Sequence, residues 1–182
     1  MKKIISLLLA FSVFLGGCKL IDKLTQFNVS YSTNFTIPAT NVLGLPIPIL
    51  NIIQPDEVTT NSTQTFTNNN TRSDLIEEVL LKKLVLTITS PSAQKFDFLK
   101  SADLFISADG LPEIKVASVD NINDATVGNT IEMVPSAQDL KEYLKKSKIT
   151  IRVAATADKT TDNSITVKVD ATFFVDAKIL GV

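Results

Sequence analysis

The chain reads ITVKVDATFFVDA from Ile165 to Ala177, its longest alternation of apolar and polar side chains. The apolar face consists of Ile165, Val167, Val169, Ala171, Phe173, Val175 and Ala177, and the intervening polar residues include Thr166, Lys168, Asp170 and Thr172. Successive side chains of a strand point to opposite faces, so this period of two predicts a long strand with one face on a core.

The same period of two recurs elsewhere in the chain. It is found in residues 27–35 (Phe27, Val29, Tyr31, Thr33 and Phe35), 84–89 and 149–155. Asp109-Gly110, between apolar residues 104–106 and 114–116, predicts a tight hairpin turn. The polar residues 158–163 separate the last two strands and predict that these strands also form a hairpin.

Two short helices are also expected. Ser136 and Asp139, after Pro135, resemble a helix start signal, and Leu140, Tyr143 and Leu144 share one helical face. A second helix is predicted to begin near Ser73, with Leu75, Ile76, Val79 and Leu80 as its apolar stripe. Helices this short are marginal alone, so we expect them to cover an end of a sheet.

These patterns together predict the fold class. Short amphipathic strands separated by polar turns are typical of a mainly β protein, here an antiparallel β-sandwich, Ig-like or related, with two short helices. Residues 26–182 fit one domain of ordinary size.

Composition excludes several classes of function. Lys and Arg number 18 against 19 Asp and Glu, so there is no basic surplus for nucleic acid. The chain has no His and one Cys, which removes imidazole catalysis, His/Cys zinc sites and intramolecular disulfides. No Ser lies in a persuasive nucleophile motif, and Glu77/Glu78 and Asp120/Asp124 are expected in solvated segments. We therefore expect no catalytic residue, no cofactor, no metal and no enzymatic activity.

Two Asp- and Asn-rich segments leave an alternative open. They contain Asp120, Asn123 and Asp124, and Asp158, Asp162 and Asn163. Neither segment has the ligand spacing of an EF-hand, and turns require the same residue types, so turn formation and weak calcium binding both remain compatible with them.

The N-terminus has the pattern of a signal peptide. Lys2 and Lys3 precede residues 4–15, which carry no charge. Twelve residues in a helix reach only about 18 Å, too short for the roughly 30 Å core of a bilayer. Residues 1–17 are therefore predicted to be a removable export signal.

Leu15-Gly16-Gly17-Cys18 resembles the lipobox of bacterial lipoproteins at all four positions. The resemblance covers only this segment and names no family for the mature domain. It implies cleavage by lipoprotein signal peptidase, a diacylglycerol thioether and further acylation such as palmitate at Cys18, and a short tether over residues 18–25. An Asp directly after the lipidated Cys resembles an inner-membrane retention signal, and this chain has Lys19 at that position. The outer membrane is therefore favoured, with the periplasmic face favoured over the cell surface.

An apolar segment with two prolines spans Val42 to Ile53. Its aliphatic residues are Val42, Leu43, Leu45, Ile47, Ile49, Leu50, Ile52 and Ile53. Proline excludes a regular interior strand or helix. The segment therefore either packs on the sandwich as an extended edge or cover, or presents an apolar surface to a partner, a lipid or the membrane. The Thr- and Asn-rich residues 56–72 that follow predict a solvated loop or an edge hairpin.

The expected function is therefore that of a membrane-anchored, non-catalytic accessory subunit that docks on an outer-membrane protein complex through residues 42–53. The alternative is an anchored module that binds a hydrophobic ligand or a glycan; the lack of Trp counts against a sugar platform. A cavity of about 300 to 1,000 Å³ lined by Phe96, Phe98 or Phe105 would favour the ligand.

Replacing the thiol tests the anchor. We expect Cys18→Ser to give soluble or unprocessed protein that incorporates no labelled fatty acid in the native host, because the acceptor sulfur is lost. Label incorporation that survives the substitution would disprove the lipid anchor at this residue.

Overall fold

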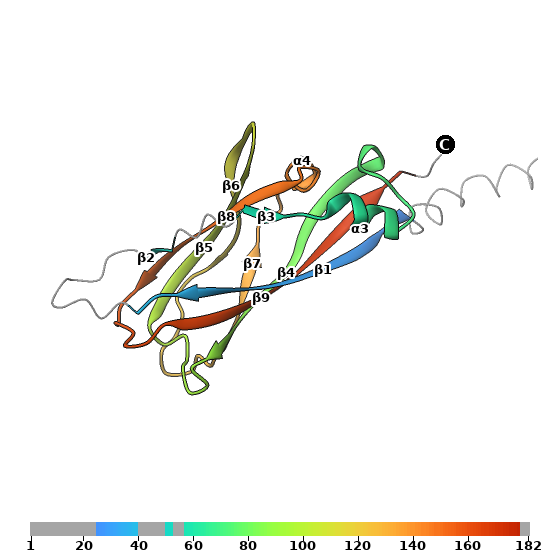
Figure 1. Cartoon of the computed structure of the whole chain (residues 1–182). Helices are drawn as coiled ribbons and strands as arrows, with labels where there is room; N and C mark the ends of the chain where they lie inside the picture. Colours follow the sequence, from blue (N-terminus) through green and yellow to red (C-terminus); the bar gives the residue numbers. More distant parts are fainter. Residues whose placement is uncertain (1–24, 40–49, 53–56, 179–182) are drawn as a thin grey trace, which may run out of the picture.

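The computed structural model describes residues 25–39, 50–52 and 57–178 (Figure 1). Several predicted functional residues lie outside this part of the chain. They are the lipobox residues Leu15, Gly16, Gly17 and Cys18, and Val42, Leu43, Leu45, Ile47, Ile49 and Ile53 of the predicted contact segment.

Nine strands and two short α-helices form the described part. They are β1 (Phe27–Ile37), β2 (Leu50–Ile52), β3 (Glu57–Thr59), α3 (Ser62–Asn68), β4 (Ile76–Ser90), β5 (Leu99–Ala108), β6 (Leu111–Val119), β7 (Thr130–Pro135), α4 (Lys141–Leu144), β8 (Lys148–Ala157) and β9 (Ile165–Ala177). Every strand pair is antiparallel. The predicted fold class, a mainly β antiparallel sandwich with two short helices, is confirmed.

The strands form two layers that share β7. One layer has the order β1-β9-β4-β7, and Figure 1 shows β9 running between β1 and β4. The other contains β6, β5 and β8, with β2 and β3 both on the outer edge of β8. β7 pairs with β4 through residues 130–133 and with β6 through Val134 and Pro135. This strand therefore carries the hydrogen-bonded sheet from one layer into the other.

β4 occupies the segment whose apolar spacing predicts a helix. Only Ser73–Leu75 is helical, as one 3-10 turn, and Ile76–Ser90 is a strand paired with β9. The predicted helix near Ser73 is therefore wrong.

Two β-bulges explain the helix-like spacing. The register of β4 against β9 shifts at Glu77 and at Lys82, where β4 carries one extra residue. Each extra residue lengthens an inward step from two residues to three. The pairs Ile76/Val79 and Leu81/Leu84 therefore imitate the i,i+3 spacing of a helix, although all four side chains are buried between the layers.

The predicted hairpin between the last two strands is also wrong. β8 pairs with β5, whereas β9 pairs with β1 and β4, so residues 158–164 cross from one layer to the other. The crossing is tied to the start of β5, where the Asp158 N–H donates to the Phe98 carbonyl oxygen at 3.1 Å. Alternation and a short polar connection predict two strands, but they do not determine whether these strands share a sheet.

The predicted hairpin around Asp109-Gly110 is confirmed. It joins β5 and β6, and Gly110 has a φ of +74°, which suits a residue without a Cβ.

The position of one predicted helix is also confirmed. α4 lies within the helix predicted after Pro135 but is only one turn long. The Asp139 carboxylate accepts hydrogen bonds from the backbone N–H groups of Lys141 and Val79, both at 3.0 Å. This carboxylate therefore stabilises the first turn of α4 and connects it to β4.

The Thr- and Asn-rich stretch 56–72 is more ordered than a solvated loop. It contains β3 and the helix α3, whose composition has low helix propensity. Phe66 of α3 is 3% exposed and belongs to the core. Burial of this one ring holds the helix against the sandwich and corrects the predicted loop. No helix of the described residues is both long and apolar enough to cross a bilayer.

Deletion of Lys82 tests the bulge. Removing this extra residue leaves Leu81 and Leu84 two residues apart, so both side chains stay on the inner face and we expect the chain still to fold. Deletion of Val85, where β4 and β9 pair residue for residue, instead moves one half of β4 to the wrong face. We expect that control to unfold the chain or to cost at least about 3 kcal/mol, comparable to truncating a large core side chain. Urea denaturation measures both, and similar midpoints would contradict the assigned bulge.

Candidate functional site

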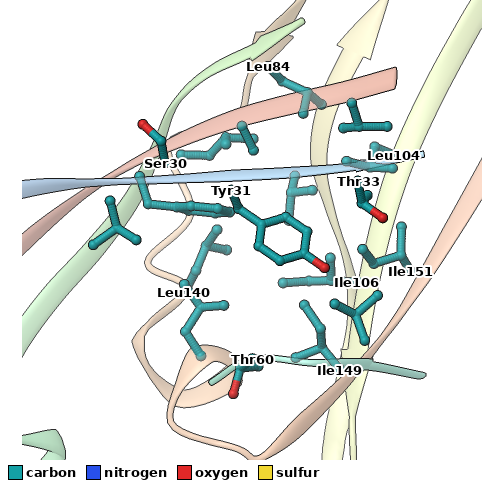
Figure 2. A pocket seen from close by; sticks show the side chains of 18 of the residues that line it. Ser30, Tyr31, Thr33, Thr60, Leu84, Leu104, Ile106, Leu140, Ile149 and Ile151 are labelled. Carbon is teal, nitrogen blue, oxygen red and sulfur yellow. The ribbon is translucent and has the colours of Figure 1, made fainter. Parts of the chain in front are cut away.

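A cavity lies between the two layers (Figure 2). Its volume is about 310 Å³, at the lower end of the range of about 300 to 1,000 Å³ found for small-molecule sites. The inner faces of β1, β4, β5, β8 and β9 form its walls, and α3 and the start of α4 border it. The cavity is therefore built from the alternating apolar positions of most of the sandwich.

The deep wall is apolar and fully covered. It includes Leu84 and Val79 of β4, Ile106 of β5 and Met133 of β7, which are all at most 5% exposed. Leu140 at the start of α4 closes the same region and is 1% exposed. The inward side chains of these strands do not fill the space between the two layers, which leaves the cavity.

The opposite side of the cavity reaches solvent. The inward residues of β1 are only half-buried, since β1 is an edge strand paired with β9 alone among the described strands. Ser30, Asn34 and Asn61 line the cavity and are exposed, so they mark its mouth between β1 and the start of α3. A solute can enter there without separating hydrogen-bonded strands.

Hydroxyl and amide groups gather near this mouth. Thr60 Oγ1 donates a hydrogen bond to the Lys146 carbonyl oxygen at 2.6 Å, and Ser62 Oγ lies 3.1 Å from the same hydroxyl oxygen. Tyr31 and Thr33 extend from the inner face of β1 into the cavity. None of the described residues that line the cavity is Asp, Glu, Lys or Arg, so the site has the chemistry of an apolar pocket with a neutral polar entrance.

The cavity has the volume that would favour a ligand, but it is not lined by Phe96, Phe98 or Phe105, the other part of that condition. Phe96 and Phe98 are at most 2% exposed and stack on each other with ring centroids 6.3 Å apart, but they do not line the cavity. Phe105 does not line it either, and the Arg152 guanidinium covers its ring at 4.1 Å. Phe35, Phe66 and Phe173 line the cavity instead. Alternation in residues 27–35 and 165–177 indicated two of these rings, together with Tyr31, as inward-facing residues.

The two Asp- and Asn-rich loops meet in space. Asp124 Oδ1 lies 3.0 Å from Lys100 Nζ, and Asp158 Oδ2 lies 2.9 Å from the same nitrogen. Asp124 Oδ2 also lies 3.1 Å from Lys159 Nζ, which is 3.6 Å from Asp97 Oδ2. Lysine ammonium groups thus pair with the carboxylates that were candidate calcium ligands. The described residues contain no group of three or more acidic, His or Cys side chains placed to hold a metal.

Two of the other residues considered for chemistry, Glu77 and Ser136, have structural partners. Glu77 pairs with Lys178 at 3.4 Å, and Ser136 Oγ donates to the Lys115 carbonyl oxygen at 3.0 Å. Of the predicted contact segment, only Leu50–Ile52 is described, and its backbone forms the edge strand β2 on β8. That position agrees with the extended-edge interpretation for these three residues.

Comparison with known proteins gives only distant similarities. No family model and no curated protein matches the chain. Among solved structures, the chain is similar to a 60-mer BFDV capsid protein, with 12% identity, a TM-score of 0.45, and coverage of 84% of this chain and 92% of that chain. It is also similar to the capsid of Helicobacter pylori bacteriophage KHP30 (9% identity, TM-score 0.33, 85% and 98% covered) and to turnip yellow mosaic virus (13%, 0.28, 86% and 85%). No functional conclusion is drawn from similarities this weak.

The ion pairs between the loops predict that the stability of the fold depends on pH. Hydrogen bonds from Lys100 and then Lys159 lower the pKa of Asp124 below its ordinary value of 3.8. The folded chain thus favours the ionised carboxylate, so this stabilisation is present above pH 3.8 and is lost as the pH falls through the lower pKa of the folded state. We expect Asp124→Asn to melt below the wild type at pH 6 and the difference to shrink below pH 3.8.

The control is Asp120→Asn, which changes an exposed residue of the same loop and should melt with the wild type at every pH. A melting difference for Asp124→Asn that is constant from pH 6 to pH 2.5 would contradict the role of the ionised carboxylate.

Proposed function

We propose that this chain is a lipid-anchored protein of the bacterial outer membrane that binds an apolar ligand between its sheet layers, without catalysing a reaction. The observation that supports ligand binding is the cavity of about 310 Å³, which has an apolar wall and an accessible mouth. Empty apolar space of this size lowers stability, by about 24 cal/mol for each Å³ in one measured series of core truncations. A ligand that fills the space offsets that cost.

The anchor rests on the sequence of the N-terminus. Leu15-Gly16-Gly17-Cys18 matches a lipobox, and nine residue steps separate Cys18 from Phe27, where β1 begins. At about 3.6 Å per step these residues span at most about 32 Å. A lipidated Cys18 would therefore keep β1, and the cavity mouth beside it, close to the membrane surface. Proximity to a bilayer suits a protein whose ligand is poorly soluble in water.

Docking on an outer-membrane complex is the second proposal, and it rests on residues 42–53. The described end of that segment, Leu50–Ile52, already pairs with β8 as an edge strand. Its pairing supports packing on the sandwich for these residues and adds nothing in favour of a partner. Crosslinked pull-down from native membranes, with and without residues 42–53, would show whether a partner depends on the segment.

A glycan is less well supported as the ligand. Sugar sites commonly present exposed aromatic rings for stacking, and this chain has no Trp and two Tyr. Tyr143 is buried and donates a hydrogen bond to the Pro112 carbonyl oxygen at 2.8 Å, while Tyr31 lines the internal cavity. Neither tyrosine forms a platform on an outer face of the sandwich.

Filling the cavity tests the ligand site. Ala171 of β9 lines the cavity, so Ala171→Leu adds three carbon atoms to the space. We expect it to weaken the binding of naphthalene, measured by its fluorescence, at least about tenfold, since forcing extra methylenes into an occupied space typically costs about 1 to 3 kcal/mol and about 1.4 kcal/mol is tenfold in affinity. Ala154→Leu, on β8 but outside the lining, is the control and should bind as the wild type does.

Folding of both variants is checked by thermal melting before binding is compared. Val169→Phe fills the cavity from a second lining position. It shows whether an effect of Ala171→Leu comes from the lost volume or from a local distortion at residue 171. Equal naphthalene affinity in the wild type and in both filling variants would reject the cavity as the binding site.

A further inference from the structure

We propose that the ligand of the cavity is an uncharged molecule with a single hydrogen-bonding group, and that the Tyr31 hydroxyl binds this group inside the apolar space. This inference rests on the proposed function, because it specifies the chemical class of the ligand for the same cavity. It assigns to Tyr31 the role of selecting that ligand.

The lining determines the charge of the ligand. No Asp, Glu, Lys or Arg is found among the described residues that line the cavity. Moving an ionised carboxylate or ammonium into apolar surroundings without a partner costs more free energy than the apolar contacts of a small ligand provide. Such groups therefore shift their pKa or stay in water. A fatty-acid anion or an amphiphilic cation could place only its chain in this cavity, with its charge at the mouth. A neutral molecule can enter entirely.

Tyr31 determines where a polar group of the ligand is accepted. Figure 2 shows its ring reaching from β1 into the cavity, with the hydroxyl directed toward Ile106, Ile149 and Ile151. These aliphatic side chains offer no hydrogen bond, and the Tyr31 hydroxyl has no hydrogen-bond partner among the described residues. The Tyr31 side chain is half-buried, and its hydroxyl is not among the buried side-chain atoms that lack a partner, so solvent in the cavity can reach it. By contrast, Tyr143 is buried and its hydroxyl donates to the Pro112 carbonyl oxygen at 2.8 Å. The Tyr31 hydroxyl is therefore available to a polar group that enters the cavity.

Water in the cavity competes with the ligand for this hydroxyl. An ordered internal water needs two to four polar neighbours. The side chains labelled around the Tyr31 hydroxyl in Figure 2 are aliphatic, so a water there is poorly ordered. A ligand that displaces such a water and keeps one hydrogen bond to Tyr31 gains affinity.

The volume limits the size of the ligand body. An apolar cavity of about 150 Å³ accommodates one benzene molecule. A cavity of about 310 Å³ is twice as large, which corresponds to roughly twelve carbon atoms on the same scale. The ligand class is therefore a neutral alcohol, phenol, ketone or ester with an apolar body of about this size, or the corresponding end of a larger neutral lipid whose remainder leaves through the mouth.

Three naphthalene probes separate the parts of this proposal. Naphthalene has no polar group, 2-naphthol carries one neutral hydroxyl at pH 7, and 2-naphthoate is an anion of nearly the same shape. We expect 2-naphthol to bind the wild type about fivefold more tightly than naphthalene, which corresponds to about 1 kcal/mol. We expect 2-naphthoate to bind at least about tenfold more weakly than 2-naphthol.

Tyr31→Phe removes the hydroxyl and keeps the ring. It should abolish the advantage of 2-naphthol, measured as the ratio of the two affinities within the same variant. The matched control is Tyr143→Phe, which makes the same change at a tyrosine outside the cavity lining and should retain the wild-type ratio between the two probes. Thermal melting confirms that both variants are folded.

The outcomes distinguish this inference from the proposed function. If naphthalene binds but 2-naphthol has no advantage, or if Tyr31→Phe keeps that advantage, the role of Tyr31 is rejected while the apolar site stands. If 2-naphthoate binds as tightly as 2-naphthol, the requirement for a neutral ligand is rejected. If none of the three probes binds the wild type, both the inference and the proposed function are wrong.

Discussion

Pairing of β9 with β1 on one edge and with β4 on the other is the constraint on which the rest of the structure depends. The ladder with β1 runs without a break from Phe27 opposite Val175 to Ile37 opposite Ile165. With every second side chain of β9 directed inward, the neighbouring strands must present their own apolar positions to the same side. That requirement places bulges in β4, because its apolar residues are not spaced evenly by two.

The cavity follows from how the two layers are joined. β7 links them along one side, and residues 158–164 cross between them at one end, where Phe96 and Phe98 fill the interior. The ion pairs of Lys100 with Asp124 and Asp158 fasten the loops at that end. On the opposite side, β1 and β3 are edge strands that are not hydrogen-bonded to each other. The interior is thus tightly packed where the layers are connected and open where they are not.

This arrangement gives the proposed site its selectivity. Its walls come from strands whose inward residues are aliphatic, so the free energy of binding would come mainly from removing apolar surface from water. Hydroxyl groups extend from β1, from Thr60 after β3 and from the start of α3 at the accessible side. Charged residues of the described chain lie elsewhere, on outer faces and at loops. A site of this kind favours neutral ligands over charged ones, because a charged group would have to leave water without gaining a partner.

Sequence alone determined which residues of the two longest regular alternations face inward. Alternation in residues 27–35 and 165–177 predicted strands β1 and β9 with the correct faces, because the period of two is a property of the extended backbone. Only the tertiary structure decided that β8 and β9 lie in different layers, that residues 76–81 form a bulged strand, and that a cavity separates the layers. Strand partners, bulges and unfilled space all depend on contacts between segments far apart in the chain, and local periodicity carries no information about those contacts.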